Sequence, residues 1–272
     1  MGRTRRSGQR TYLVSLKSDR QQFRRSPAHD NRDGERLFSL KITKFEVQTT
    51  LTMAKIKVWT GLGENLPTVY IHSVAGNGEN VWKRCLAQDG APQFNLVSVY
   101  DFDFEGELTP WPAPGVRKSL PMFKGNAEAH LEYLINQVIP EAESMLTSPP
   151  SYRIIAGYSL AGLFAFWTAW HTDVFKRIAC GSASFWYPGF TDYMKSHPML
   201  SVPDYVYLSL GDNESNTKHP VMSRVGDCTD EVLNYLSDKE IPHFFEVNPG
   251  NHFSDPDGRL AKAILKTLLY LH

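Results

Sequence analysis

The chain of 272 residues has little of several features that define large classes of protein. Its three cysteines, Cys85, Cys180 and Cys228, form no CxxC pair, so we expect neither a zinc site nor a dithiol redox motif. Lysine and arginine together number 29, and aspartate and glutamate also number 29. The chain therefore lacks the basic excess of a dedicated nucleic-acid binder, and we expect no nucleic-acid partner.

Long hydrophobic runs are also missing. The longest apolar stretch covers residues 162–170, which is too short to cross a bilayer, and no basic segment leads into a hydrophobic signal core. We therefore expect a cytoplasmic protein without a membrane partner. No P-loop or dinucleotide motif opens a helix, and the alternating carboxylates of residues 101–107 lack a ligand-loop pattern. We accordingly expect no cofactor and assign no metal ion.

The charge that is present is distributed unevenly. Residues 1–52 contain 12 lysines and arginines against 5 acidic residues, so we predict a basic N-terminal extension over 1–52 and a catalytic domain over 53–272. We interpret the extension as a poorly ordered arm or as sequence upstream of a natural start at Met53. The alternatives are a targeting or nucleic-acid-binding arm and, over residues 38–48, a strand at the edge of the main sheet.

From residue 66 onward, short β-rich apolar runs alternate with segments of helical periodicity. Strands are predicted over 68–72, 96–100, 152–156, 177–180, 205–210 and 243–247. Helices are predicted over 127–146, 160–172, 226–239 and 259–271. This alternation predicts an α/β fold with a mainly parallel central sheet, helices on both faces, and an active site at the carboxyl ends of the strands.

The strongest motif surrounds Ser159, in Arg153-Ile-Ile-Ala-Gly-Tyr-Ser-Leu-Ala-Gly-Leu-Phe-Ala. A β-rich run, a serine and an immediate helix are the context of a nucleophile elbow, the strained turn of an α/β-hydrolase. Gly157 and Ala161 are small enough to let the strand and the helix approach each other. The commoner pattern has glycine where Ala161 stands, and a tight turn with an incidental serine is the alternative. We predict that Ser159 is the nucleophile.

A serine hydroxyl is nearly inert until a general base takes its proton. In α/β-hydrolases the base is a histidine that follows the nucleophile and the acid in the chain. His252 lies in Asn248-Pro-Gly-Asn-His-Phe-Ser, a turn directly after the last β-rich run. We therefore predict His252 as the general base, with the loop residues His197 and His219 as weaker alternatives.

The acid is expected in Gly211-Asp-Asn-Glu-Ser215, after the predicted strand over 205–210. Asp212 and Glu214 could both accept a hydrogen bond from the imidazole, and their chemistry leaves the choice open. The oxyanion of a tetrahedral intermediate also needs backbone donors. We predict the N–H of Leu160 and one N–H from the loop Ser73-Val-Ala-Gly-Asn-Gly78, either that of Ser73 or that of Val74.

These segments resemble the serine esterase family that includes esterase D, feruloyl esterases and the enterobactin and salmochelin siderophore esterases. The resemblance extends from about Lys55 to the C-terminus, and it depends on Gly-Tyr-Ser159-Leu-Ala-Gly-Leu-Phe-Ala, Ser-Leu-Gly-Asp-Asn-Glu214 and Asn-Pro-Gly-Asn-His252-Phe. It implies Glu214 as the acid, at the end of a Gly-x-x-acid pattern, with Asp212 as the runner-up. Some siderophore esterases resemble Ser-His dyads without an acid.

The resemblance also implies a shared framework around the pocket mouth, formed by Trp111-Pro-Ala-Pro and Ser184-Phe-Trp-Tyr-Pro188. Trp111, Trp186 and Tyr187 are the candidate substrate-binding residues. Packing of these aromatic rings in the core is the alternative.

These observations predict a serine esterase that acts on a small-molecule ester through an acyl-enzyme. Acyl transfer at the same site is one alternative, because it depends only on whether water or another alcohol reaches the intermediate. A binding protein that keeps the fold without catalysis is the other, although its expected sign, loss of a catalytic residue, is absent. Specificity resides in the loops that shape the pocket.

Overall fold

The computed structural model describes residues 53–116 and 122–271. The predicted basic extension over 1–52 and the edge strand over 38–48 lie outside the described residues and stay predictions. Within the described ranges, no helix is both long and apolar enough to span a membrane.

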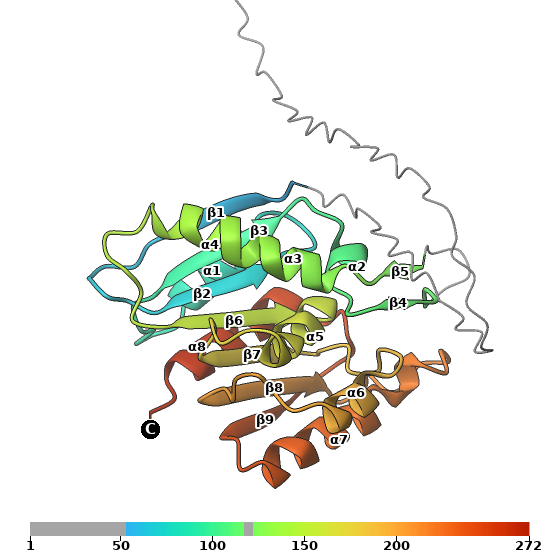
Figure 1. Cartoon of the computed structure of the whole chain (residues 1–272). Helices are drawn as coiled ribbons and strands as arrows, with labels where there is room; N and C mark the ends of the chain where they lie inside the picture. The colour runs from blue at the N-terminus through green and yellow to red at the C-terminus, as the bar shows by residue number, and fades with distance from the viewer. Residues whose placement is uncertain (1–52, 117–121, 272) are drawn as a thin grey trace, which may run out of the picture. The chain divides into compact units, whose positions relative to one another are not determined.

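Seven strands form the main sheet in the order β1-β3-β2-β6-β7-β8-β9 (Figure 1). Their bounds are β1 Lys55–Trp59, β2 Thr68–His72, β3 Asn95–Tyr100, β6 Arg153–Tyr158, β7 Arg177–Gly181, β8 Tyr205–Gly211 and β9 His243–Asn248. β1 pairs antiparallel with β3, and all other neighbours are parallel. The α/β fold with a mainly parallel sheet is confirmed.

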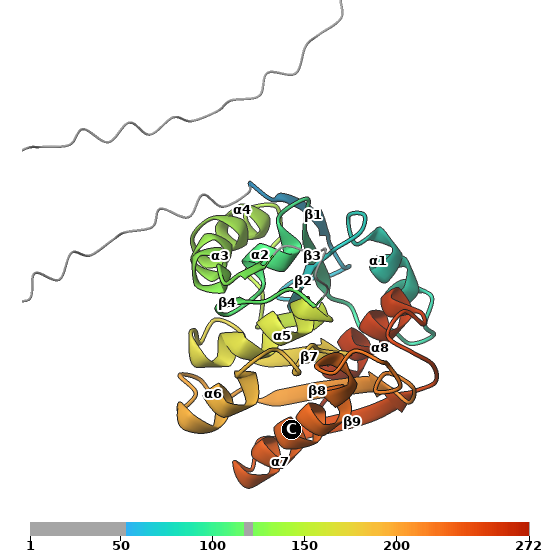
Figure 2. The same ribbon diagram turned by 90° about the vertical axis from the view of Figure 1, so that its right-hand side faces the viewer.

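Helices cover both faces of this sheet (Figure 2). One face carries α1 Glu79–Leu86 and α8 Pro256–Leu268, which pack against each other, and α8 also packs on β6, β7 and β8. The other face carries α3 Ala127–Tyr133, α4 Ile139–Glu143, α5 Leu160–Trp167, α6 Phe190–Ser196 and α7 Val225–Asp238. The small elements are α2 Phe104–Glu107, β4 Pro112–Ala113, β5 Phe123–Lys124 and a 3₁₀ turn over Met222–Arg224.

The continuous apolar runs of the strands follow from this two-sided cover. In β2, Val69 and Ile71 pack with α1 and α8, whereas Tyr70 packs in the separate cluster on the opposite face. Successive side chains of a strand point to opposite faces, so both faces must be apolar when both are covered. Cys85, Cys180 and Cys228 are free and buried.

The helices differ from their predicted bounds for local chemical reasons. The predicted helix over 127–146 contains a π-helical turn over Leu134–Val138 just before Pro140, which has no N–H to continue the α-helical pattern. The last helix begins at Pro256, three residues before the predicted start, because Asp255 caps it by accepting from the Gly258 N–H. Proline at the first helical position is favourable.

Candidate active site

Ser159 lies at a strained turn between the end of β6 and the start of α5. Its backbone φ angle is 60°, in the left-handed region that residues other than glycine adopt rarely. A Cβ on Gly157 would lie 2.1 Å from the carbonyl carbon of Ala161, and one on Gly162 would lie 2.9 Å from the Cβ of Ala183. The turn therefore requires the small residues that the motif supplies.

His252 lies in the loop between β9 and α8, with its two ring nitrogens directed to different partners. Its Nε2 is 3.1 Å from the Ser159 Oγ, and its Nδ1 is 2.8 Å from the Glu214 Oε2. The Tyr158 hydroxyl donates to the His252 carbonyl at 2.7 Å. Serine, imidazole and carboxylate thus form one continuous chain of contacts at the carboxyl ends of β6, β8 and β9.

Glu214 is the carboxylate of this chain, and its side chain is 2% exposed. Its other oxygen, Oε1, accepts from the Ser182 hydroxyl at 2.6 Å and from the Gly211 N–H at 2.7 Å. Burial of the Glu214 carboxyl opposes its ionisation, but hydrogen bonds, of which that from His252 is the strongest, lower its pKa below the usual value. Glu214 is therefore an anion at neutral pH.

Asp212 has a different position. Its carboxylate accepts from the Gly250 N–H at 2.8 Å, and its own N–H donates to the Asn248 carbonyl at 2.9 Å. These bonds connect the β8 loop to the loop that carries His252. Glu214 therefore contacts the imidazole, whereas Asp212 connects the two loops through hydrogen bonds.

Arg259 is a buried cation in contact with Glu214. The sequence analysis did not identify it as a site residue. Its Nη1 donates to the Glu214 Oε1 at 3.0 Å and to the Tyr158 hydroxyl at 3.2 Å, and its Nη2 donates to the Pro249 carbonyl at 2.8 Å. In the sequence it is one basic residue at the start of an amphipathic helix. No local signal distinguishes it from a solvated arginine.

Ser159 and His252 line a cavity of about 950 Å³. Its walls come mainly from residues 72–83 on one side and from Phe253, Pro256, Asp257 and Leu260 on the other. This volume lies in the range of small-molecule sites, roughly 300–1,000 Å³.

The two predicted oxyanion donors border this cavity. Leu160 opens α5, where a first-turn N–H has no partner within the helix. The N–H of Ser73 already donates to the Val99 carbonyl at 2.9 Å, so of the two candidates from this loop the Val74 N–H is the one without that bond. Val74 lines the cavity and is 75% exposed.

A buried histidine pair lies behind the same loop. His72 ends β2 and lines the cavity, and its ring is 5.0 Å from that of His130. Both ring nitrogens of His72 are buried without a hydrogen-bond partner among the described residues, whereas His130 Nδ1 lies 2.8 Å from the Glu107 Oε2. Desolvation, together with the neighbouring His130, holds the pKa of His72 well below its usual value. His72 is therefore neutral at pH 7.

The three aromatic residues predicted for substrate binding lie together beside α6. Tyr187 is 1% exposed and its hydroxyl donates to the Trp111 carbonyl, while Trp111 Nε1 donates to the Pro188 carbonyl at 2.8 Å. Trp186 is half-buried and packs against the core. None of the three lines the Ser159 cavity, and this placement favours the packing alternative for Tyr187.

Comparison with known proteins gives the family. The family model described as "Putative esterase" matches residues 60–252. The chain belongs to this esterase family. It is an enzyme that hydrolyses esters, as the resemblance predicts. Among the described residues of this esterase, no group of three His, Cys, Asp or Glu side chains could hold a metal ion.

Individual relatives are distant. The chain is 25% identical over 179 residues to the uncharacterized protein YbbA of Bacillus subtilis (strain 168). The aligned part covers 64% of this chain and 72% of YbbA. Its fold is similar to that of an IroE-like serine hydrolase from Shewanella oneidensis, with TM-score 0.65, 17% identity and coverage of 78% and 75%. It is also similar to the siderophore hydrolase EstA from Aspergillus nidulans, with TM-score 0.60, 14% identity and coverage of 78% and 94%.

Proposed function

We propose that this esterase cleaves a small-molecule carboxylic ester through an acyl-enzyme on Ser159, with His252 as general base and Glu214 as the acid. The observation that supports this is the contact chain in which Ser159 Oγ, His252 and Glu214 follow one another at 3.1 and 2.8 Å. The chain of contacts ends at the wall of a cavity that can accept a substrate.

In the first step the Ser159 hydroxyl attacks the ester carbonyl while its proton passes to the Nε2 of His252. The Nδ1–H of His252 donates to Glu214, which fixes the tautomer and stabilises the imidazolium. The imidazolium then protonates the leaving alcohol. Water, activated by the same histidine, hydrolyses the acyl-enzyme and restores Ser159.

The negative charge of each tetrahedral intermediate lies on the former carbonyl oxygen. We assign the N–H groups of Leu160 and Val74 as its donors, since both border the cavity beside Ser159. Backbone donors of this kind are fixed before the reaction and need no reorganisation, so each contributes about 2.7–4 kcal/mol to the transition state.

Labelling with a fluorophosphonate probe, combined with hydrolysis of p-nitrophenyl acetate, tests this proposal. Wild-type protein should be labelled and should hydrolyse the ester, and Ser159→Ala should lose both properties. Ser237→Ala, at an exposed position on α7, is the matched control and should keep both. Folded wild-type protein that is neither labelled nor active would overturn the assignment of Ser159.

Acyl transfer uses the same intermediate and differs only in the acceptor. Adding a primary alcohol to the assay distinguishes the two reactions, because a transferase forms a new ester at the expense of the free acid. We propose hydrolysis as the reaction because the family is one of esterases.

A further inference from the structure

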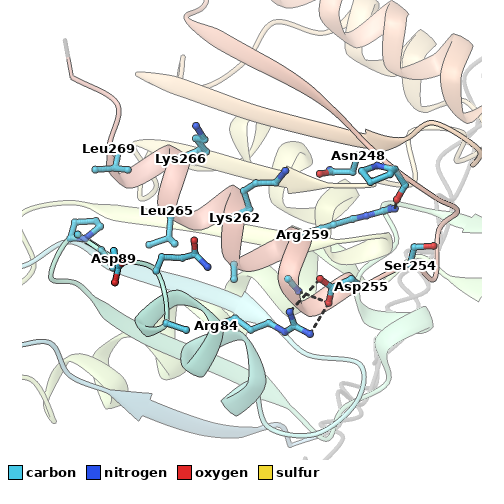
Figure 3. A pocket seen from close by; sticks show the side chains of 18 residues that line it. Arg84, Asp89, Asn248, Ser254, Asp255, Arg259, Lys262, Leu265, Lys266 and Leu269 are labelled. Atoms are coloured by element: carbon cyan, nitrogen blue, oxygen red, sulfur yellow. Dashed lines mark hydrogen bonds and ion pairs between the residues drawn. The ribbon is translucent and has the colours of Figure 1, made fainter.

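A second pocket, of about 600 Å³, lies between the C-terminal end of α1 and the length of α8 (Figure 3). None of its lining residues borders the Ser159 cavity. Its volume is also in the range of small-molecule sites, roughly 300–1,000 Å³. It is therefore a separate candidate binding site on the α1 and α8 face of the sheet.

The pocket combines apolar walls with cationic side chains, three of which, Arg84, Arg259 and Lys262, are paired with Asp255, Glu214 and Glu246. The apolar side chains come from α8, from its C-cap and from the segment after α1: Ala87, Ala91, Pro92, Ala261, Leu265 and Leu269. Four cationic residues line it, Arg84, Arg259, Lys262 and Lys266, against two acidic ones, Asp89 and Asp255. A ligand with an apolar chain and a negative charge is complementary to such a surface.

Two polar groups of the pocket, on Lys266 and Asn248, lack an ion-pair or hydrogen-bond partner among the described residues. Arg84 pairs with Asp255 at 2.8 Å and Lys262 with Glu246 at 2.7 Å, but within the described part of the chain no ion pair involves Lys266.

Asn248 supplies the second of these groups. Its Nδ2 is buried without a hydrogen-bond partner among the described residues. Figure 3 shows Asn248, Ser254 and Arg259 toward one end of the pocket and Leu269 and Asp89 toward the other. A buried donor without an acceptor is unfavourable, so an anionic acceptor beside Asn248 would be stabilised.

The pocket also contacts both ends of the loop that carries His252. Asn248 and Pro249 precede the histidine, Ser254 and Asp255 follow it, and all four line the pocket.

Arg259 provides the second link to the active site, because it donates to the Pro249 carbonyl at 2.8 Å and to Glu214 at 3.0 Å. An anion next to Arg259 would compete with both acceptors for the guanidinium. Binding here is thus coupled to the position of the imidazole and its acid.

We propose that this pocket binds an amphipathic monocarboxylate, and that its occupancy slows ester hydrolysis without blocking the Ser159 cavity. The inference about rate rests on the proposed function, because it concerns ester hydrolysis at Ser159. A monocarboxylate is the class of product that the hydrolysis of a simple aliphatic ester releases. The inference about binding does not depend on turnover.

Calorimetric titration of octanoate into full-length Ser159→Ala protein tests binding in the absence of turnover. Octanoate should bind at least tenfold more tightly than octanamide, its uncharged match, which corresponds to about 1.4 kcal/mol. Lys266→Glu and Leu269→Glu should each weaken octanoate binding tenfold or more. Leu271→Glu, at a residue that is 87% exposed and outside the pocket, should leave it unchanged.

Kinetics of the wild-type protein then test the coupling. Octanoate should lower kcat for p-nitrophenyl acetate with little change in KM, and Leu269→Glu should relieve this inhibition. Equal binding of octanamide, binding unaffected by both pocket variants, or purely competitive inhibition would each overturn the proposal. A wild-type protein without esterase activity counts against the Ser159 mechanism, while the calorimetric titration still decides whether the pocket binds carboxylate.

Discussion

The guanidinium of Arg259 lies 3.0 Å from the carboxylate of Glu214, and the two side chains are only 5% and 2% exposed. Both are charged groups with little access to water, so each depends on the other for compensation. Removing one partner of such a pair costs about 3–5 kcal/mol, because the remaining charge stays buried and unpaired. The same contact supports the fold and the candidate acid.

Arg259→Met should therefore lower the free energy of unfolding by about 3 kcal/mol and also reduce kcat. Urea denaturation and ester hydrolysis measure the two effects. Arg224→Met is the matched control, since Arg224 is 61% exposed and 3.9 Å from Glu231, and surface pairs contribute about 0–1 kcal/mol. An unchanged denaturation midpoint for Arg259→Met would contradict this account of the pair.

Glu214→Gln should reduce kcat by roughly 10³–10⁴-fold, because an amide cannot stabilise the imidazolium and favours the wrong tautomer. The variant keeps the size of the side chain but leaves the buried Arg259 without its counter-charge, so its free energy of unfolding should also fall, by about 3 kcal/mol. Asp212→Asn should change kcat by less than about tenfold, since Asp212 accepts from Gly250 and not from His252. The assignment of the acid is wrong if Asp212→Asn has the larger effect.

Local sequence patterns predict those parts of the site that depend on neighbours in the chain. Ser159 lies among small residues between a strand and a helix, and His252 follows Pro249 and Gly250 at the end of a strand. The structure brings the two side chains within 3.1 Å. The six predicted strands correspond to β2, β3, β6, β7, β8 and β9, which carry apolar runs. The edge strand β1 was not predicted, because Lys55 and Lys57 interrupt its apolar residues.

Contacts between distant parts of the chain are not encoded in such patterns. Asp212 and Glu214 share one turn and one chemistry, and only their directions relative to His252 separate them. Arg259 contacts Tyr158, which lies 101 residues earlier in the chain, and nothing near Arg259 marks it as buried. Tyr187, predicted at the pocket mouth, packs in the core because Trp111 covers it.

Stability at mildly acid pH should depend on His72, whose pKa lies well below its usual value because its ring is desolvated. An unfolded chain protonates this ring below about pH 6.5, whereas the folded protein does not. The unfolded state then binds more protons, so the free energy of unfolding falls as pH decreases from about 6.5, by up to about 1.4 kcal/mol per pH unit. At higher pH this contribution is constant.

Urea denaturation of wild type and His72→Asn between pH 7.5 and 5.0 measures this dependence. The variant should be less stable at pH 7.5 and should show a shallower decline toward pH 5.0. His197→Asn, at an exposed position, should decline as the wild type does. Glu214, whose pKa lies below its usual value because of its hydrogen bonds, affects a lower pH range and does not obscure the comparison. Parallel curves for wild type and His72→Asn would exclude a buried neutral His72.

Substitutions of the two small residues beside Ser159, Gly157 and Ala161, should have opposite effects. A methyl group on Gly157 would lie 2.1 Å from the backbone of Ala161, and backbone atoms cannot move aside without separating β6 from α5. Gly157→Ala should therefore abolish esterase activity and lower the melting temperature. Ala161→Gly removes a methyl group and creates the commoner form of the motif.

Ala161→Gly should cost about 1 kcal/mol through helix propensity and should keep kcat within a few-fold of wild type. Circular dichroism melts and p-nitrophenyl acetate hydrolysis measure both variants. Ala161 is itself fully buried. Comparing Gly157→Ala with Ala161→Gly therefore shows whether this turn requires small residues for packing or requires alanine in particular. If Gly157→Ala were active and stable, the strand and helix would not be in the close contact that orients the Ser159 hydroxyl toward His252.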